Sequence, residues 1–110
     1  HSWLFPRVNA VVHHGGCGTT AAGLLSGKPS IICPFFGDQP FWGRHVARLG
    51  VGPSPIPHKK LTVARLGRAI DALMNDATMR RNAVELGNRL REESGTANAV
   101  AFITQWMNRQ

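Results

Sequence analysis

The chain has 110 residues, of which 43% are hydrophobic and 17% are charged, and 13 basic against six acidic side chains give a formal net charge of +7. This composition is typical of one small globular domain and excludes a disordered chain, and no apolar run reaches the roughly 18–20 residues of a membrane span. The basic residues are spread along the sequence, so we interpret the charge as solvated helix faces that favour anionic ligands, and we expect no nucleic-acid partner. Cys17 and Cys33 lie in or beside apolar segments, which is typical of reduced thiols in a cytosolic protein.

The first half of the sequence alternates strand and helix patterns. Short apolar runs at Val8–His13 and Ser30–Pro34 predict two buried parallel strands, and Gly18–Lys28 between them predicts a helix. Strand, loop, helix and strand within about thirty residues form a βαβ unit. A second helix is predicted over Pro40–Leu49, and Val51–Pro57, which contains three prolines, predicts an extended connection.

The second half predicts helices only. Thr62 is the expected N-cap of a helix that runs to Leu73 or Met74. Asp76 opens another helix, whose apolar face is formed by Met79, Ala83, Leu86 and Leu90. A final helix is indicated by one apolar stripe and a neighbouring aromatic pair, Ala97, Val100, Ile103 and Met107 with Phe102 and Trp106. We expect an α/β fold with a short parallel sheet flanked by helices, a βαβ segment over residues 1–58 and a helical segment over residues 59–110. Since parallel sheets normally have more strands, the chain is predicted to be part of a larger α/β domain.

A glycine-rich loop joins the first predicted strand to the first predicted helix. It reads His13-His14-Gly15-Gly16-Cys17-Gly18-Thr19-Thr20. Glycines let the backbone approach a ligand, and the start of a helix offers unpaired N–H groups with positive potential, so this loop suits a phosphate. The histidine and threonine side chains add further donors. The alternative is a glycine-rich turn that caps a helix and binds nothing.

A second polar cluster follows the other predicted strand. The segment Pro34–Trp42 contains Asp38 and Gln39 and leaves the same edge of the sheet as the glycine loop, where open α/β sheets bind ligands. A carboxylate beside a carboxamide suits vicinal hydroxyls, although Asp38 could instead simply cap a helix. A phosphate loop next to a reader of hydroxyls predicts a nucleotide-sugar site.

Two other functions stay open on the residues alone. Gly16-Cys17-Gly18-Thr19-Thr20-Ala21 fits the dinucleotide fingerprint, with Asp38 about twenty residues on, which allows a nicotinamide-dependent oxidoreductase. The net charge allows a non-catalytic module that binds anions. A metal site is not expected, because the available ligands do not have the spacing of known sites: His13, His14, Cys17, Cys33 and His45.

Three motifs in this order resemble the donor-binding signature of the UDP-sugar-dependent glycosyltransferases with the GT-B fold. They are His14-Gly15-Gly16-Cys17-Gly18-Thr19, Gly27-Lys28-Pro29 and Pro34-Phe35-Phe36-Gly37-Asp38-Gln39. The doubled histidine and the run Pro-Phe-Phe-Gly-Asp-Gln-Pro-Phe-Trp-Gly are similar to the sterol 3-beta-glucosyltransferases, particularly those of fungi. The resemblance implies a Rossmann-like C-terminal half-domain, with the uracil-reading segment and the N-terminal domain expected before His1. It implies no catalytic residue in this chain, because the family's base belongs to the N-terminal domain. The acceptor pocket belongs to that domain as well, so the sterol acceptor is expected to bind through it.

The resemblance also implies a role for each motif residue. The donor phosphates would be bound by His14, Gly16, Gly18, Thr19 and Thr20, and the sugar by Asp38 and Gln39. The implied reaction is inverting transfer of glucose from UDP-glucose to the 3-beta-hydroxyl of a sterol, without metal or other cofactor and without turnover by this chain alone. Another lipid or natural-product acceptor is the alternative. A cytoplasmic protein with peripheral membrane contact is expected, and Cys17, which stands where the family has Ala, is expected to make the site sensitive to thiol reagents.

Overall fold

The computed structural model describes residues 4–92 and 103–107. The elements follow in chain order as the 3-10 helix η1 (Phe5–Arg7), strand β1 (Val11–His13), helix α1 (Cys17–Leu25), strand β2 (Ser30–Ile32), helix α2 (Gln39–Arg48), the 3-10 helix η2 (His58–Lys60), helix α3 (Val63–Met74) and helix α4 (Ala77–Glu92). Residues 103–107 are helical as well. Every element predicted within the described residues is therefore present, with bounds that differ by a few residues.

The two strands form a short parallel pair. Val11, Val12 and His13 lie opposite Ser30, Ile31 and Ile32. Both strands are shorter than their apolar runs, because the pairing begins where the Val11 N–H donates to the Pro29 carbonyl and ends where the Cys33 N–H donates to the His13 carbonyl. In a parallel pair the carboxyl ends of both strands lie at one edge of the sheet, so the loops that follow β1 and β2 start side by side.

The proline-rich segment after α2 lies along the side of β2 that does not pair with β1. The Ser30 N–H donates to the Val51 carbonyl at 2.9 Å, and the Ile56 N–H donates to the Ile32 carbonyl at 2.9 Å. Prolines at positions 53, 55 and 57 have no N–H to donate, so the segment follows β2 without completing a strand ladder. The prediction of an extended connection is confirmed.

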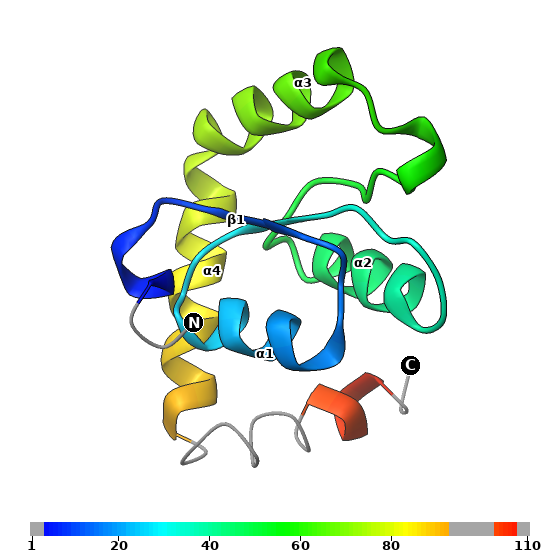
Figure 1. Cartoon of the computed structure of the whole chain (residues 1–110). Helices are drawn as coiled ribbons and strands as arrows, with labels where there is room; N and C mark the ends of the chain where they lie inside the picture. The colour runs from blue at the N-terminus through cyan, green and yellow to red at the C-terminus, as the bar shows by residue number, and fades with distance from the viewer. Residues whose placement is uncertain (1–3, 93–102, 108–110) are drawn as a thin grey trace.

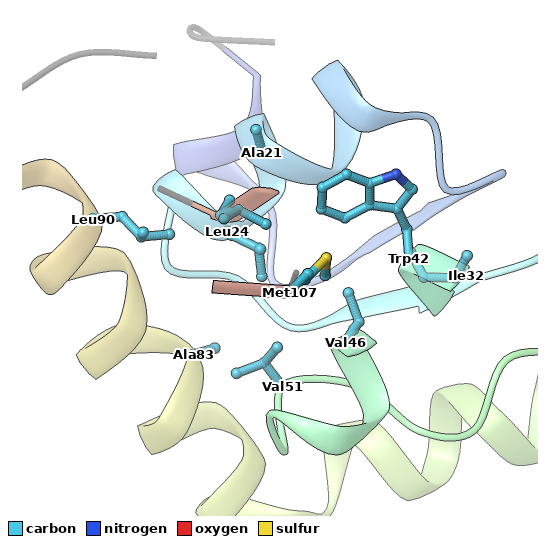
Figure 2. Close-up of a cluster of buried hydrophobic side chains, with 10 residues drawn as sticks. Ala21, Leu24, Ile32, Trp42, Val46, Val51, Ala83, Leu90 and Met107 are labelled. Carbon is cyan, nitrogen blue, oxygen red and sulfur yellow. The ribbon is translucent and has the colours of Figure 1, made fainter. Parts of the chain in front are cut away.

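Helices cover both faces of the strands. In Figure 1, α3 lies on one side of the strands, and α1 and α2 lie on the other. The residues of β2 alternate between the two faces: Ile32 packs with the cluster around α1 and α2, whereas Ile31 and Cys33 pack with Leu73 of α3. Figure 2 shows the larger cluster, which consists of Ala21, Leu24, Ile32, Trp42, Val46, Val51, Ala83, Leu90, Ile103 and Met107.

The last predicted helix is confirmed in part. Ile103 and Met107 are buried in the larger cluster, and Trp106 packs against it, as their helical spacing predicts. Ala97, Val100 and Phe102 lie outside the described residues. Among residues 4–92 and 103–107, no helix combines the length and the apolar character needed to cross a lipid bilayer.

A glycine on α4 allows this helix to pack closely on the end of α1. A Cβ added at Gly87 would lie 2.7 Å from Gly27 Cα, 2.8 Å from Gly27 N and 3.0 Å from the Leu24 carbonyl oxygen. These are backbone atoms, which cannot move aside as the end of a flexible side chain does. The absence of a side chain at Gly87 therefore sets the distance between α1 and α4.

Gly87→Ala should lower the free energy of unfolding by roughly 1–3 kcal/mol, because the new methyl group overlaps the backbone at the end of α1. The matched control is Gly67→Ala on α3, where an added Cβ meets nothing within 4 Å. That change should raise the free energy of unfolding by about 1 kcal/mol, since alanine is the better helix former. Urea denaturation followed by circular dichroism measures both values, and a similar effect of the two changes would contradict the close packing at Gly87.

Candidate functional site

The two polar motifs meet at the carboxyl ends of β1 and β2 through Gly15. A Cβ added at this residue would lie 2.7 Å from Ile32 Cγ2 and 3.0 Å from the Gln39 carbonyl oxygen. Its φ of +93° is also a conformation that residues with side chains rarely adopt. The glycine loop after β1 therefore lies directly against the end of β2 and the first residue of α2.

The doubled histidines hold the glycine loop in place. His13 Nδ1 accepts the N–H of Gly15 at 3.0 Å, and His14 Nδ1 accepts the N–H of Gly16 at 3.0 Å. Because Nδ1 is the acceptor in both rings, Nε2 carries the proton of each neutral imidazole. His14 is exposed, so its Nε2–H is available to a ligand. His13 Nε2 is buried and has no partner among the described residues.

The start of α1 leaves backbone donors unused. Gly16 is the N-cap and has no side chain to cap the helix, and the first bond of the helix runs from the Thr20 N–H to the Gly16 carbonyl at 2.8 Å. The N–H groups of Cys17, Gly18 and Thr19 therefore have no acceptor within the helix. An added Cβ at Gly18 would meet nothing within 4 Å, so the space beside these donors is open. This helix end can bind an anion.

The two threonines of the loop differ in exposure. Thr19 is half-buried, whereas Thr20 is 1% exposed and its Oγ1 has no partner among the described residues. Thr19 thus lies with the open donors of the helix start, and the structure does not bring the Thr20 hydroxyl to this surface.

Asp38 and Gln39 are both partly committed to contacts within the protein. Asp38 Oδ2 accepts the Trp42 Nε1–H at 3.0 Å, and the side chain of Asp38 makes no capping bond to α2. Gln39 is buried, and its Oε1 accepts the N–H of Phe35 at 2.8 Å and the N–H of Phe36 at 3.1 Å. Asp38 Oδ1 and the amide NH2 of Gln39 remain for a ligand with hydroxyl groups.

Trp42 is a positioning residue that sequence reasoning missed. It is 5% exposed in the larger core cluster, yet its indole N–H holds the exposed carboxylate of Asp38. The only signal in the sequence is the spacing of four residues, which places Asp38 and Trp42 on the same side of a helix start.

Two side chains of the loop, His13 and Cys17, have perturbed pKa values. Burial, with a smaller effect of the neighbouring His14, lowers the pKa of His13 from 6.5 to about 4, so this ring is neutral at pH 7. Burial and then the Asp38 carboxylate raise the pKa of Cys17. The effect of the Asp38 carboxylate on the Cys17 thiol means that the two motifs interact electrostatically. It also acts against the expected sensitivity to thiol reagents, because the reactive form of a cysteine is the thiolate.

The five candidate metal ligands do not come together as a site. Among the described residues, no group of three or more histidine, cysteine, aspartate and glutamate side chains could hold a metal ion. His45 packs instead in the core, where its ring centroid lies 4.5 Å from that of Phe41 and 6.1 Å from that of Trp106. Burial, followed by Arg48 and Arg44, lowers its pKa.

Comparisons with known proteins agree on one family and one fold. The family described as erythromycin biosynthesis protein CIII-like, C-terminal domain, matches residues 2–103. Sterol 3-beta-glucosyltransferase UGT80A2 of Arabidopsis thaliana is 52% identical over 100 residues, which cover 91% of this chain and 16% of the relative. A sterol 3-beta-glucosyltransferase of Emericella nidulans is 48% identical over 103 residues, which cover 94% of this chain and 7% of the relative.

A solved structure, the glycotransferase of kitacinnamycin, matches with a TM-score of 0.76 and 30% sequence identity, over 93% of this chain and 26% of that one. The chain spans less than a fifth of the length of the two sterol 3-beta-glucosyltransferases from Arabidopsis thaliana and Emericella nidulans.

The free energy of unfolding should fall as the pH is lowered from 7 towards 4. In this range the unfolded chain protonates His13, whose usual pKa is 6.5, but the folded chain does not, so the stabilisation present above pH 6.5 is lost. His45 acts in the same direction. Urea denaturation at several pH values measures the effect. His13→Asn, which keeps an acceptor near the Gly15 N–H, should flatten the pH dependence, and an unchanged slope would contradict the assignment.

Asp38→Asn should accelerate alkylation of Cys17 by iodoacetamide severalfold at pH 8, because removing the carboxylate lowers the pKa of the thiol. Mass spectrometry of the digested protein measures the rate at each cysteine. Cys33 is the internal control, since burial alone raises its pKa, and its rate should stay the same. Equal rates at Cys17 in both proteins would mean that the two motifs are not electrostatically coupled.

Proposed function

Since the chain belongs to the family of erythromycin biosynthesis protein CIII-like C-terminal domains, we propose that it is the donor-binding part of a sterol 3-beta-glucosyltransferase. Its fold is the α/β, Rossmann-like C-terminal half-domain of a GT-B glycosyltransferase, as the sequence predicts. The names of the relatives from Arabidopsis thaliana and Emericella nidulans support glucose transfer to a sterol. The observation that carries the proposal is the open start of α1 beside Asp38.

The diphosphate of UDP-glucose would lie at the start of α1. The unused N–H groups of Cys17, Gly18 and Thr19 can donate to phosphate oxygens, and the helix dipole favours the negative charge. The exposed His14 can add the hydrogen bond of its Nε2–H. Gly16 contributes by leaving room for the ring of His14, because an added Cβ would lie 2.6 Å from His14 Cε1 and displace the ring.

The glucose would lie between the diphosphate and the start of α2. Asp38 Oδ1 can accept from one sugar hydroxyl, and the amide NH2 of Gln39 can donate to a neighbouring one. Because Trp42 and the backbone of Phe35 and Phe36 hold the other oxygens, these two side chains are oriented before the donor binds.

The proposed reaction is attack of the sterol hydroxyl on the anomeric carbon, with inversion, as UDP leaves. The chain's contribution is electrostatic: the N–H groups of α1 and His14 stabilise the negative charge that grows on the departing diphosphate, so the proposal requires no metal. The catalytic base would come from another part of the protein, and this chain alone should not turn over. A cytoplasmic location with peripheral membrane contact stays a prediction.

The place of Asp38 argues against the other functions. A nicotinamide cofactor would require an acid at the end of the second strand to bind the ribose, whereas Asp38 lies beyond a loop at the start of α2, bonded to Trp42. A basic anion-binding module would not need this carboxylate. Transfer to another lipid or natural product would use the same donor site, so the acceptor rests on the likeness to the sterol enzymes.

Titration of the chain with UDP-glucose, UDP and NADH by NMR tests the donor site. UDP and UDP-glucose should bind in preference to NADH. His14→Ala should weaken both uridine ligands about tenfold, since it removes a hydrogen bond to a charged oxygen. Asp38→Ala should weaken UDP-glucose about tenfold and leave UDP unchanged.

Two further variants serve as comparisons in this titration. Gly18→Ala fills the open space beside the helix donors, so it should weaken UDP without lowering the free energy of unfolding. Glu85→Ala, which removes an exposed acid on α4, should change neither ligand. Preference for NADH, or equal loss of UDP and UDP-glucose in Asp38→Ala, would contradict the proposed roles.

A further inference from the structure

Two phenylalanines are exposed in the loop that leads to the proposed sugar site although they are apolar. Phe35 is 52% exposed and Phe36 is 74% exposed, in the loop between β2 and α2. Exposure of large apolar side chains to water is unfavourable in free energy, and a ligand or a partner that covers them removes this cost. Their place in the loop that carries Asp38 separates them from the exposed apolar residues of α3 and α4.

The loop that carries the two phenylalanines is held firmly. Gln39 Oε1 accepts both of their N–H groups, and the Gln39 N–H donates back to the Phe36 carbonyl at 3.3 Å. The Phe35 ring stacks on His58, with ring centroids 4.6 Å apart and an angle of 8° between the planes. The His58 N–H donates to the Pro34 carbonyl at 3.0 Å. Phe36 therefore extends from a braced backbone, with Phe35 fixed next to it.

Phe36 and Asp38 belong to one tight turn. The bond from the Gln39 N–H to the Phe36 carbonyl closes the turn, and Gly37 within it has a φ of +65°. Since Asp38 is proposed to hold the glucose, Phe36 lies at the rim of the sugar position. An acceptor whose hydroxyl reaches the anomeric carbon must place its remaining atoms next to that sugar.

We infer that Phe36, supported by Phe35, forms an apolar wall on which the ring system of the acceptor packs while its hydroxyl faces the glucose. The inference rests on the proposed function and extends it, because it assigns part of the acceptor selectivity to the donor-binding segment. A flat fused-ring alcohol such as a sterol matches the wall in chemistry, and a polar acceptor would leave Phe36 exposed to water.

Kinetics in a complete enzyme test this wall. The chain would replace the 100 matched residues of the Arabidopsis thaliana relative, and the KM values for a sterol and for UDP-glucose would be measured. Phe36→Ser should raise the KM for the sterol about tenfold and leave the KM for UDP-glucose unchanged, since only the acceptor loses an apolar contact. Val84→Ser is the matched control, because Val84 is 51% exposed on α4, away from the loop, and should change neither value.

The outcomes separate this inference from the proposed function. Glucosylation of the sterol with an unchanged sterol KM in Phe36→Ser would overturn the wall and leave the proposed function standing. A rise in the KM for UDP-glucose instead would mean that Phe36 packs on the donor sugar, which also overturns it.

A direct binding measurement decides the matter if the hybrid enzyme is inactive. The chain would be titrated with the fluorescent sterol dehydroergosterol on methyl-β-cyclodextrin in the presence of UDP, with energy transfer from tryptophan as the signal. Phe36→Ser should weaken sterol binding about tenfold and Val84→Ser should not. Absence of sterol binding, or an equal loss of binding to sterol-free phosphatidylcholine vesicles, would show that the loop does not recognise the acceptor.

Discussion

The contact of Gly15 with Ile32 and with the backbone of Gln39 is the constraint on which the site depends. It brings the glycine loop of β1 against the start of α2, and it leaves no room for a Cβ. The parallel pairing of β1 and β2 puts both loops at one edge, but pairing alone does not make them touch. Because Gly15 allows this approach, a helix start with open donors and a carboxylate held by Trp42 face the same region.

The polar side chains at this edge have two roles each. One atom of His14, Asp38 and Gln39 bonds to the protein itself, while another is left for a ligand. Such a site is arranged before anything binds, so little free energy is lost in ordering it. The same bonds restrict the conformations that these side chains can adopt.

The larger core cluster supports the loops that carry the site. Ile32 is packed among residues of α1, α2 and α4, so the end of β2 is fixed in the largest apolar cluster of the described structure. Trp42 joins this cluster to the surface, because its ring is buried while its N–H holds Asp38. The close packing of Gly87 on Gly27 fixes the far end of α1 in turn. The chain spans less than a fifth of the length of these relatives. Its own core nevertheless supports the loops at the carboxyl ends of the strands.

The sequence by itself determined the alternation of strands and helices, the extended proline segment and the two motifs at one edge. Apolar periodicity, prolines and glycines act locally, so they can be interpreted without the fold. Only the tertiary structure decided that Thr20 is buried, that the amide oxygen of Gln39 holds the backbone of Phe35 and Phe36, and that burial lowers the pKa of His13. Burial, rotamers and electrostatic surroundings depend on how separate segments pack, and no pattern along the chain records those distances.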